Sequence, residues 1–170
     1  IISIVYTGVT DVARHINKTS EFMITPKVIK VEQIWTGYGT GTGISIPVTI
    51  TSVPNSYFVA VIAIDTATGQ GSPSLGGVGV PFLAGSNLVI GCFINGLINP
   101  TVGSHNFTTT IGASASWRVV CYQLSGVNQS TPTINNNTAQ TSGTSASTNV
   151  NTVQNGLLID AISIANGAGG

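Results

Sequence analysis

Charged residues are scarce in this sequence. Of its 170 residues, five are Lys or Arg and five are Asp or Glu, which is 6% of the chain and gives a formal net charge of +0. A typical soluble domain has about 25% charged residues. Because no cluster of Lys or Arg is present to neutralise phosphates, we expect no nucleic acid partner. A soluble domain with so little charge tends to self-associate, so we expect its surface to be covered by copies of itself or by glycan.

Long apolar runs are also absent. A membrane-spanning helix needs about 18 or more consecutive apolar residues, and no window of the sequence supplies them. The best apolar runs, 57–64 and 87–94, have the length of β-strands. We therefore predict no membrane span. The sequence starts at Ile1 without a Met, which indicates that a leader has been removed or that residues precede Ile1.

Groups suited to catalysis are few and scattered. The carboxylates lie far apart along the chain, and neither His15 nor His105 belongs to a motif. There is no nucleophile–base arrangement, no metal-ligand spacing and no phosphate-binding loop. The Gly-rich stretch GYGTGTG (37–43) precedes a predicted strand rather than a helix, so we interpret it as a flexible lead-in. The sequence therefore predicts a protein that is not an enzyme and that binds no metal or cofactor.

The charge that is present is concentrated near the start of the chain. Seven of the ten charged residues lie in the first 32 positions: Asp11, Arg14, Lys18, Glu21, Lys27, Lys30 and Glu32. The β-branched opening IISIVYTG predicts a strand. We therefore divide the chain into an N-terminal strand and assembly segment, 1–36, and a main domain, 37–170.

The main domain has the pattern of an all-β protein. Residues 44–53 alternate with a period of two, as in a strand with one face in water. Residues 56–65 form a continuous apolar run, which predicts a central strand covered on both faces. No segment shows a 3.6-residue apolar period over three turns, so we expect little or no helix. Many short strands separated by turn signals predict a sandwich or a barrel.

The stretch 122–150 contains no Asp, Glu, Lys or Arg and is rich in Thr, Ser, Asn, Gln and Gly. Thr at alternating positions favours strands. We predict two edge strands within 132–155, on either side of the turn TSGTS (141–145). A linker is the alternative interpretation of the same residues.

Three segments carry a family resemblance: NPTVGSHNFTTTI (99–111), WRVVCYQLSGVNQSTP (117–132) and NGLLIDAISI (155–164). They resemble the strands and turns of an Ig-like or jelly-roll β-sandwich module of prokaryotic surface proteins and phage virion proteins. The resemblance covers residues 37–165 and implies a sandwich that serves in display or assembly. The chain departs from the module in its charged N-terminal segment and in ending NGAGG where the module continues with further strands.

Two pairs of residues are candidates for structural bonds. Cys92 and Cys121 both lie in predicted strands, and they either form a disulfide bond or are two small buried residues. Asp160 lies inside the apolar segment LLIDAISI, where a carboxylate requires a partner. Arg118 is alone in its own strand, so we predict a buried ion pair between Arg118 and Asp160.

Four asparagines begin the Asn-X-Ser/Thr pattern of glycan acceptors: Asn17, Asn106, Asn128 and Asn136. Such matches also arise by chance in a chain rich in Asn and Thr. Glycan at these positions would cover a surface that has little charge.

The sequence favours a structural subunit of an extracellular or virion assembly, a filament or a shell, whose partners are copies of itself. In this interpretation the N-terminal strand fills an unpaired edge, in the same chain or in a neighbouring copy. The residues of this donor strand are Ile1, Ile2, Ile4, Val5 and Tyr6. We expect the protein outside the cell, at the cell surface or in a virion.

The alternative interpretation is an adhesin or a carbohydrate-binding surface module. Sugar rings stack on exposed aromatic side chains, and the candidates are Trp35, Tyr38, Trp117 and Tyr122. Trp117 and Tyr122 lie within a predicted strand, which favours a place in the core for both.

Overall fold

The computed structural model describes residues 4–6, 28–86, 90–133, 136–138, 149–151 and 155–161. Within these ranges the chain forms β-strands and no helix, so the all-β prediction is confirmed. No helix that could cross a membrane occurs among them. All the strand pairs are antiparallel.

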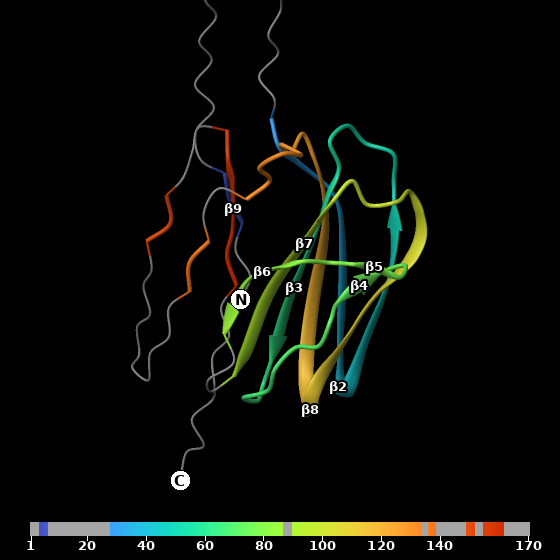
Figure 1. The fold of residues 1–170 in the computed structure, drawn as a ribbon, viewed down its shortest axis with the longest axis vertical. Coiled ribbons are helices and arrows are strands. Elements are labelled where there is room, and N and C mark those ends of the chain that lie inside the picture. Colours follow the sequence, from blue (N-terminus) through green and yellow to red (C-terminus); the bar gives the residue numbers. More distant parts are fainter. Residues whose placement is uncertain are drawn as a thin grey trace, which may run out of the picture.

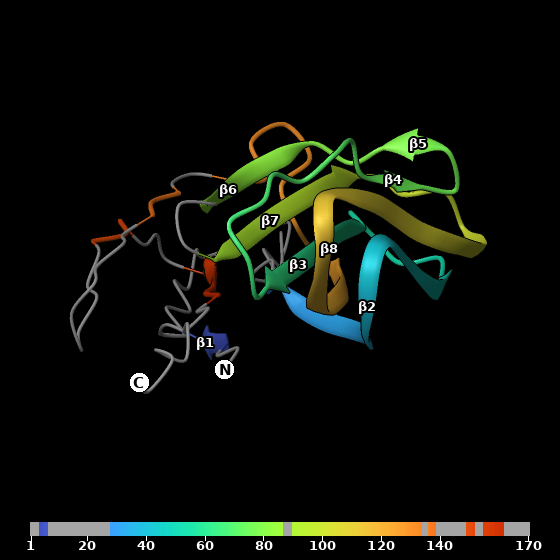
Figure 2. The same cartoon turned by 90° about the horizontal axis from the view of Figure 1, so that it is seen from below.

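Two long strands form the frame of the molecule. Strand β2 (Lys30–Ile50) pairs with β8 (Gly103–Ser125) along its whole length, from Lys30 opposite Ser125 to Ile50 opposite Gly103. The register shifts between Gly41 and Gly43, and Gly41 has a φ of 119°, which favours glycine. Such a bulge bends a strand, and Figure 2 shows β2 and β8 curving together.

The bend divides the main sheet into two parts. The second half of β8 pairs with β3 (Tyr57–Ile64), which pairs with β7 (Gly91–Ile98). Strand β6 (Phe82–Ser86) completes that side. The first half of β8 pairs with β4 (Ser74–Leu75), which pairs with β5 (Val78–Gly79). The resulting order is β5-β4-β8-β3-β7-β6, with β2 alongside β8 (Figure 1).

The main core lies on the concave side of this bent sheet. Apolar side chains from both halves of β2 and β8 and from β3 meet there, because the alternating residues of each strand point to one face. The rings of Phe58, from β3, and Phe107, from the first half of β8, are 5.7 Å apart between centroids. This contact joins the two halves of the bent sheet.

A second apolar cluster lies on the other face of β3. It contains Tyr57, Val59, Val61, Tyr122 and Leu124. Since Phe58, Ala60, Ile62 and Ile64 of β3 belong to the main core, the prediction that this apolar run is a central strand covered on both faces is confirmed.

The ends of the described chain meet in a separate two-stranded sheet. Strand β1 (Ile4–Tyr6) pairs with β9 (Leu157–Ile159), with Ile4 opposite Ile159. Leu157 and Ile159 pack against the second apolar cluster. The two-stranded sheet is therefore attached to the main sheet through side chains of β9.

The structure differs from three interpretations of the sequence. The Gly-rich stretch 37–43 is not a flexible lead-in but part of β2, because glycines leave room for side chains of the main core. The expected domain boundary at 36–37 falls inside this uninterrupted strand. Two edge strands were expected within 132–155, but the described residues 132–133, 136–138, 149–151 and 155 form no strand, and the other residues of this range lie outside the described part of the chain.

Candidate functional site

The free edge of β2 is the most prominent feature that could serve an interaction. In the described part of the chain, β2 pairs only with β8, so its opposite edge presents unpaired N–H and C=O groups along 21 residues. A long edge strand is a template for pairing with another chain, and proteins usually guard such edges with charge, proline or bulges. From Gln33 to Ile50, β2 has no charged residue.

Exposed apolar side chains flank the first half of this edge. Ile34 is 54% exposed and Tyr38 is 80% exposed. The guanidinium carbon of Arg118, the residue opposite Tyr38 on β8, lies 5.8 Å from the centre of the Tyr38 ring. This cation–π contact orients an aromatic ring that has few other neighbours.

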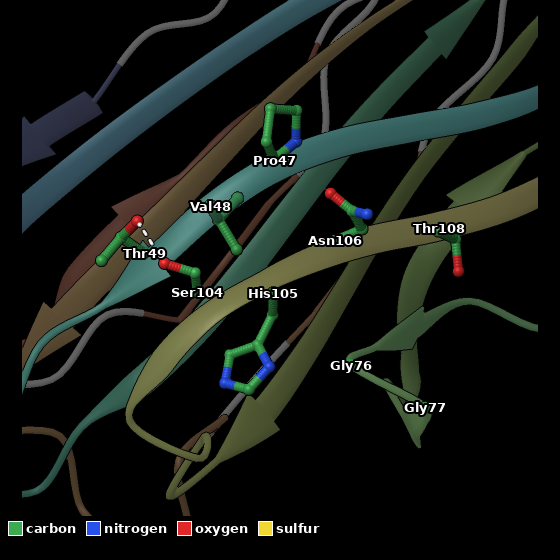
Figure 3. Close-up of a pocket in the computed structure, with 9 residues that line it drawn as sticks. All are labelled: Pro47, Val48, Thr49, Gly76, Gly77, Ser104, His105, Asn106 and Thr108. Atoms are coloured by element: carbon green, nitrogen blue, oxygen red, sulfur yellow. Dashed lines mark hydrogen bonds between the residues drawn. The ribbon is translucent and has the colours of Figure 1, made fainter.

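A shallow polar pocket adjoins the second half of β2 (Figure 3). Its volume is about 580 Å³, and its lining comes from β2, β8 and the turn between β4 and β5. The lining residues are Pro47, Val48, Thr49, Gly76, Gly77, Ser104, His105, Asn106 and Thr108. Hydroxyl groups, an amide and an imidazole are therefore available for hydrogen bonds to a polar molecule.

His105 is held in this pocket by the backbone. Its Nε2 lies 2.9 Å from the carbonyl oxygen of Thr101, so Nε2–H donates a hydrogen bond to that carbonyl. Gly76 has a φ of 56°, and a side chain there would collide with the imidazole. No carboxylate lines the pocket, and the described residues contain no group of three or more His, Cys, Asp or Glu suited to a metal.

An apolar groove lies between the main sheet and β9. Its volume is about 460 Å³, and its walls include Tyr57, Val59 and Ile94 on one side and Leu157 and Ile159 on the other. Burial raises the pKa of the Tyr57 phenol, and a hydrogen bond with Thr133 opposes this shift. Strand β9 therefore forms one wall of the groove.

Of the two alternatives for the cysteines, the structure has no disulfide bond: Cys92 and Cys121 are free thiols, Cys121 buried and Cys92 half-buried. Cys121 is buried in the main core, whereas Cys92 is followed by the core residue Phe93 and therefore points to the opposite face. The thiols lie on opposite faces of one sheet and cannot meet. Burial, and to a lesser degree the charge of Asp160, raises the pKa of Cys92 to about 11. Burial also raises the pKa of Cys121.

Arg118 and Asp160 do not form the predicted buried ion pair, because both side chains are exposed. Strand β9 ends at Ile159, so Asp160 lies just beyond the apolar strand and reaches water. Arg118 points away from the main core and contacts Tyr38. Neither charge requires a buried partner.

The predicted glycan acceptors are accessible where they are described. Asn106, Asn128 and Asn136 are exposed, and Asn17 lies outside the described residues. Asn128 accepts hydrogen bonds at Oδ1 from the backbone N–H groups of Ser130, at 2.9 Å, and Thr131, at 3.3 Å. Asn136 Nδ2 donates to the carbonyl of Leu83 at 2.7 Å, which occupies the nitrogen that would carry a glycan.

The predicted donor strand is described only in part. The backbone of Ile4, Val5 and Tyr6 forms β1 and pairs with β9 of the same chain. Ile1 and Ile2 lie outside the described residues.

The four aromatic candidates for sugar stacking differ in their exposure to solvent. Trp117 and Tyr122 are buried, as their place in a predicted strand indicated. Trp35 is half-buried and packs against the main core. Tyr38 is the one of the four that is largely exposed.

Sequence reasoning missed two features of this surface. The sequence did not predict the 21-residue length of β2, because glycines such as those in 37–43 normally indicate a turn. The contribution of Gly76 and Gly77 to the polar pocket depends on the pairing of β4 with β8, which is distant in sequence. Comparison with protein-family models, curated proteins and solved structures finds no match to this chain.

Proposed function

We propose that this chain is a structural subunit of an extracellular filament or a virion, which assembles with copies of itself. The observation that carries the proposal is the edge of the 21-residue strand β2 that pairs with no other described strand, which is uncharged from Gln33 to Ile50 and flanked by exposed apolar side chains. In a monomer such an edge is an aggregation hazard. In an assembly the same edge becomes an interface, and little surface charge is needed.

The two-stranded sheet supports a second element of the proposal, donor-strand exchange. Strand β1 pairs with β9, and β9 packs against the second apolar cluster of the main sheet and forms one wall of the apolar groove. If β1 pairs with β9 of a neighbouring copy, the same pairing is kept while two subunits become linked. Exchange of identical elements is a low-cost route to association, and a head-to-tail contact whose rotation does not close makes an open polymer.

The chemistry of the described surface agrees with a structural role. The polar pocket around His105 holds no carboxylate, and the half-buried Cys92 and the buried Cys121 have raised pKa values that disfavour the reactive thiolate. We therefore propose that the protein is not an enzyme, and that it functions at a cell surface or in a virion. Glycan at Asn106 or Asn128 fits this location, because both side chains are exposed.

Negative-stain imaging and size-exclusion chromatography of the purified full chain test this proposal. We expect large regular particles. A monodisperse monomer at all concentrations would contradict a structural assembly. Deletion of residues 1–8 tests donor-strand exchange separately: we expect it to abolish polymers and to leave soluble, aggregation-prone subunits. Polymers that persist after this deletion would rule out the donor-strand mechanism but not assembly.

The alternative function is a carbohydrate-binding or adhesive module, and one observation favours it. The ring of Tyr38 is 80% exposed and oriented by Arg118, as in a platform on which a sugar ring stacks. A glycan array distinguishes the two functions. Binding that is lost in Tyr38→Ala, in a protein that stays monomeric, would support the module.

A further inference from the structure

The two halves of the β2 free edge differ in their capacity to pair. In the second half, Pro47 is part of β2, and proline has no N–H to donate to a neighbouring strand. Proline on an edge strand is a common guard against pairing. The segment 33–41 contains neither proline nor charge, and it carries the exposed Ile34 and Tyr38. Of the β2 edge that no described strand pairs with, the first half is therefore the part suited to pairing with another strand.

We propose that two copies of this chain pair antiparallel through the first half of β2, around a two-fold axis at Thr36. The proposal rests on the proposed function as an assembly subunit and specifies the contact that the free edge makes. Ile34, Thr36 and Tyr38 alternate along β2 and share one face. An axis at Thr36 places Ile34 of each copy opposite Tyr38 of the other, and the two Thr36 side chains opposite each other.

This register is the one that buries the exposed apolar side chains against each other. A shift by two residues would place Tyr38 opposite Glu32, and the opposite shift would place Ile34 opposite Thr40, which leaves apolar surface unmatched. Aromatic and β-branched side chains directly opposite each other are among the favourable cross-strand pairs. Arg118 of β8 lies over the Tyr38 ring of the same copy. The row of side chains that meets in the dimer therefore extends from β2 to β8 in each copy.

A second copy fits this edge better than a charged partner does. The segment 33–50 carries no charge, so self-pairing brings no like charges together. The nearest charged residues on β2 are Lys30 and Glu32, which have opposite signs. The contact is isologous, because each copy contributes the same residues. It therefore closes a dimer, and a polymer needs a second contact such as the exchange of β1.

Cysteine cross-linking tests the register. Thr36 is exposed, and opposite residues in an antiparallel pair have Cβ atoms about 4.5–5.5 Å apart. We expect Thr36→Cys to form an intermolecular disulfide under mild oxidation. Thr40→Cys is the matched control, since Thr40 is exposed on the same strand and would lie about 26 Å from its counterpart, eight residues away. Equal cross-linking of the two variants would overturn the register.

A charge variant tests the edge itself. Ile34→Lys with Tyr38→Lys places lysines opposite each other twice, so we expect self-association to weaken at least about tenfold. Val78→Lys with Phe82→Lys is the control, because these side chains are similarly exposed but lie away from β2. Thermal unfolding of both variants shows whether the fold is retained.

The outcomes separate the two proposals. If the wild-type protein assembles and the edge variant assembles equally well, the pairing through β2 is overturned and the proposed function stands. If the wild-type protein remains a monomer, both are overturned. A β2 edge occupied by a different extended peptide would leave Thr36→Cys without a homodimer cross-link and would likewise overturn the inference.

Discussion

The side-chain amide of Gln123 forms three hydrogen bonds with Thr51. Gln123 Nε2 donates to the Thr51 carbonyl at 2.7 Å, and Gln123 Oε1 accepts from the Thr51 N–H at 3.1 Å and from the Thr51 hydroxyl at 3.0 Å. Gln123 Nε2 also donates to Ser56 Oγ at 3.0 Å. This fully buried glutamine fixes the chain where it leaves β2, so it also fixes the end of the strand whose edge we assign to assembly.

Gln123→Leu is expected to lower the free energy of unfolding by about 2–4 kcal/mol. The leucine fills a similar volume but leaves the Thr51 and Ser56 groups without partners, and each unsatisfied group costs about 1–3 kcal/mol. Urea unfolding followed by tryptophan fluorescence measures the change. Thr51→Val removes only one hydroxyl and is expected to cost about 1 kcal/mol. Equal losses in the two variants would contradict this assignment.

Phe107→Ala is expected to lower the free energy of unfolding by about 3–5 kcal/mol, as for other buried phenylalanines. The ring is fully buried against Phe58 and joins the two halves of the bent sheet. Phe82→Ala is the matched control, because Phe82 is 57% exposed and a surface change costs about 0.5 kcal/mol or less. Urea unfolding compares them, and a small loss for Phe107→Ala would show that the two halves do not share a core.

Gly39→Ala is expected to destabilise the protein by about 1–3 kcal/mol, the range of an overpacked core. A Cβ at position 39 would lie 2.6 Å from Cζ2 of Trp117, whose ring cannot move far because it is buried. Gly43→Ala has open space at its Cβ and is the control. Thermal unfolding of the two variants measures the difference. Similar melting temperatures would contradict the packing of Trp117 on Gly39.

The thiols are expected to make stability depend on alkaline pH. Burial raises the pKa of Cys92 from 9.0 to about 11, so the folded state retains the proton more strongly than the unfolded state. The stabilisation is complete below about pH 9 and is lost as the pH rises through about 11. Urea unfolding at pH 8 and pH 10.5 measures it. Cys92→Ala with Cys121→Ala should show a weaker pH dependence, and an unchanged dependence would contradict the burial of the thiols.

Much of the fold follows from local sequence patterns. The apolar run that became β3 is covered on both faces, and the absence of a helical period matches the absence of helix in the described residues. Buried Trp117 and Tyr122 follow from their place in a strand. These features depend on the period of apolar residues, which the sequence displays directly.

The remaining features depend on partners that are distant in sequence. Gly37 lies against Ile46 and Gly39 lies against Trp117, so both positions have room only for glycine within the strand. The glycine pattern alone would indicate a turn. The cysteines cannot bond because the register of β7 and β8 turns them to opposite faces. Asp160 needs no partner because β9 ends one residue earlier. None of these relationships is encoded in a neighbouring residue.

Sedimentation velocity of the wild-type chain, beside the variant Ile34→Lys with Tyr38→Lys, tests the central claim most directly. Assembly through the first half of β2 predicts that the wild-type protein sediments as species larger than the 17.3 kDa monomer, in a proportion that rises with concentration. The variant should form these larger species in a smaller proportion at each concentration, because the β2 contact is lost while the exchange of β1 remains open to it. A wild-type protein that remains a 17.3 kDa monomer at every concentration would contradict the claim.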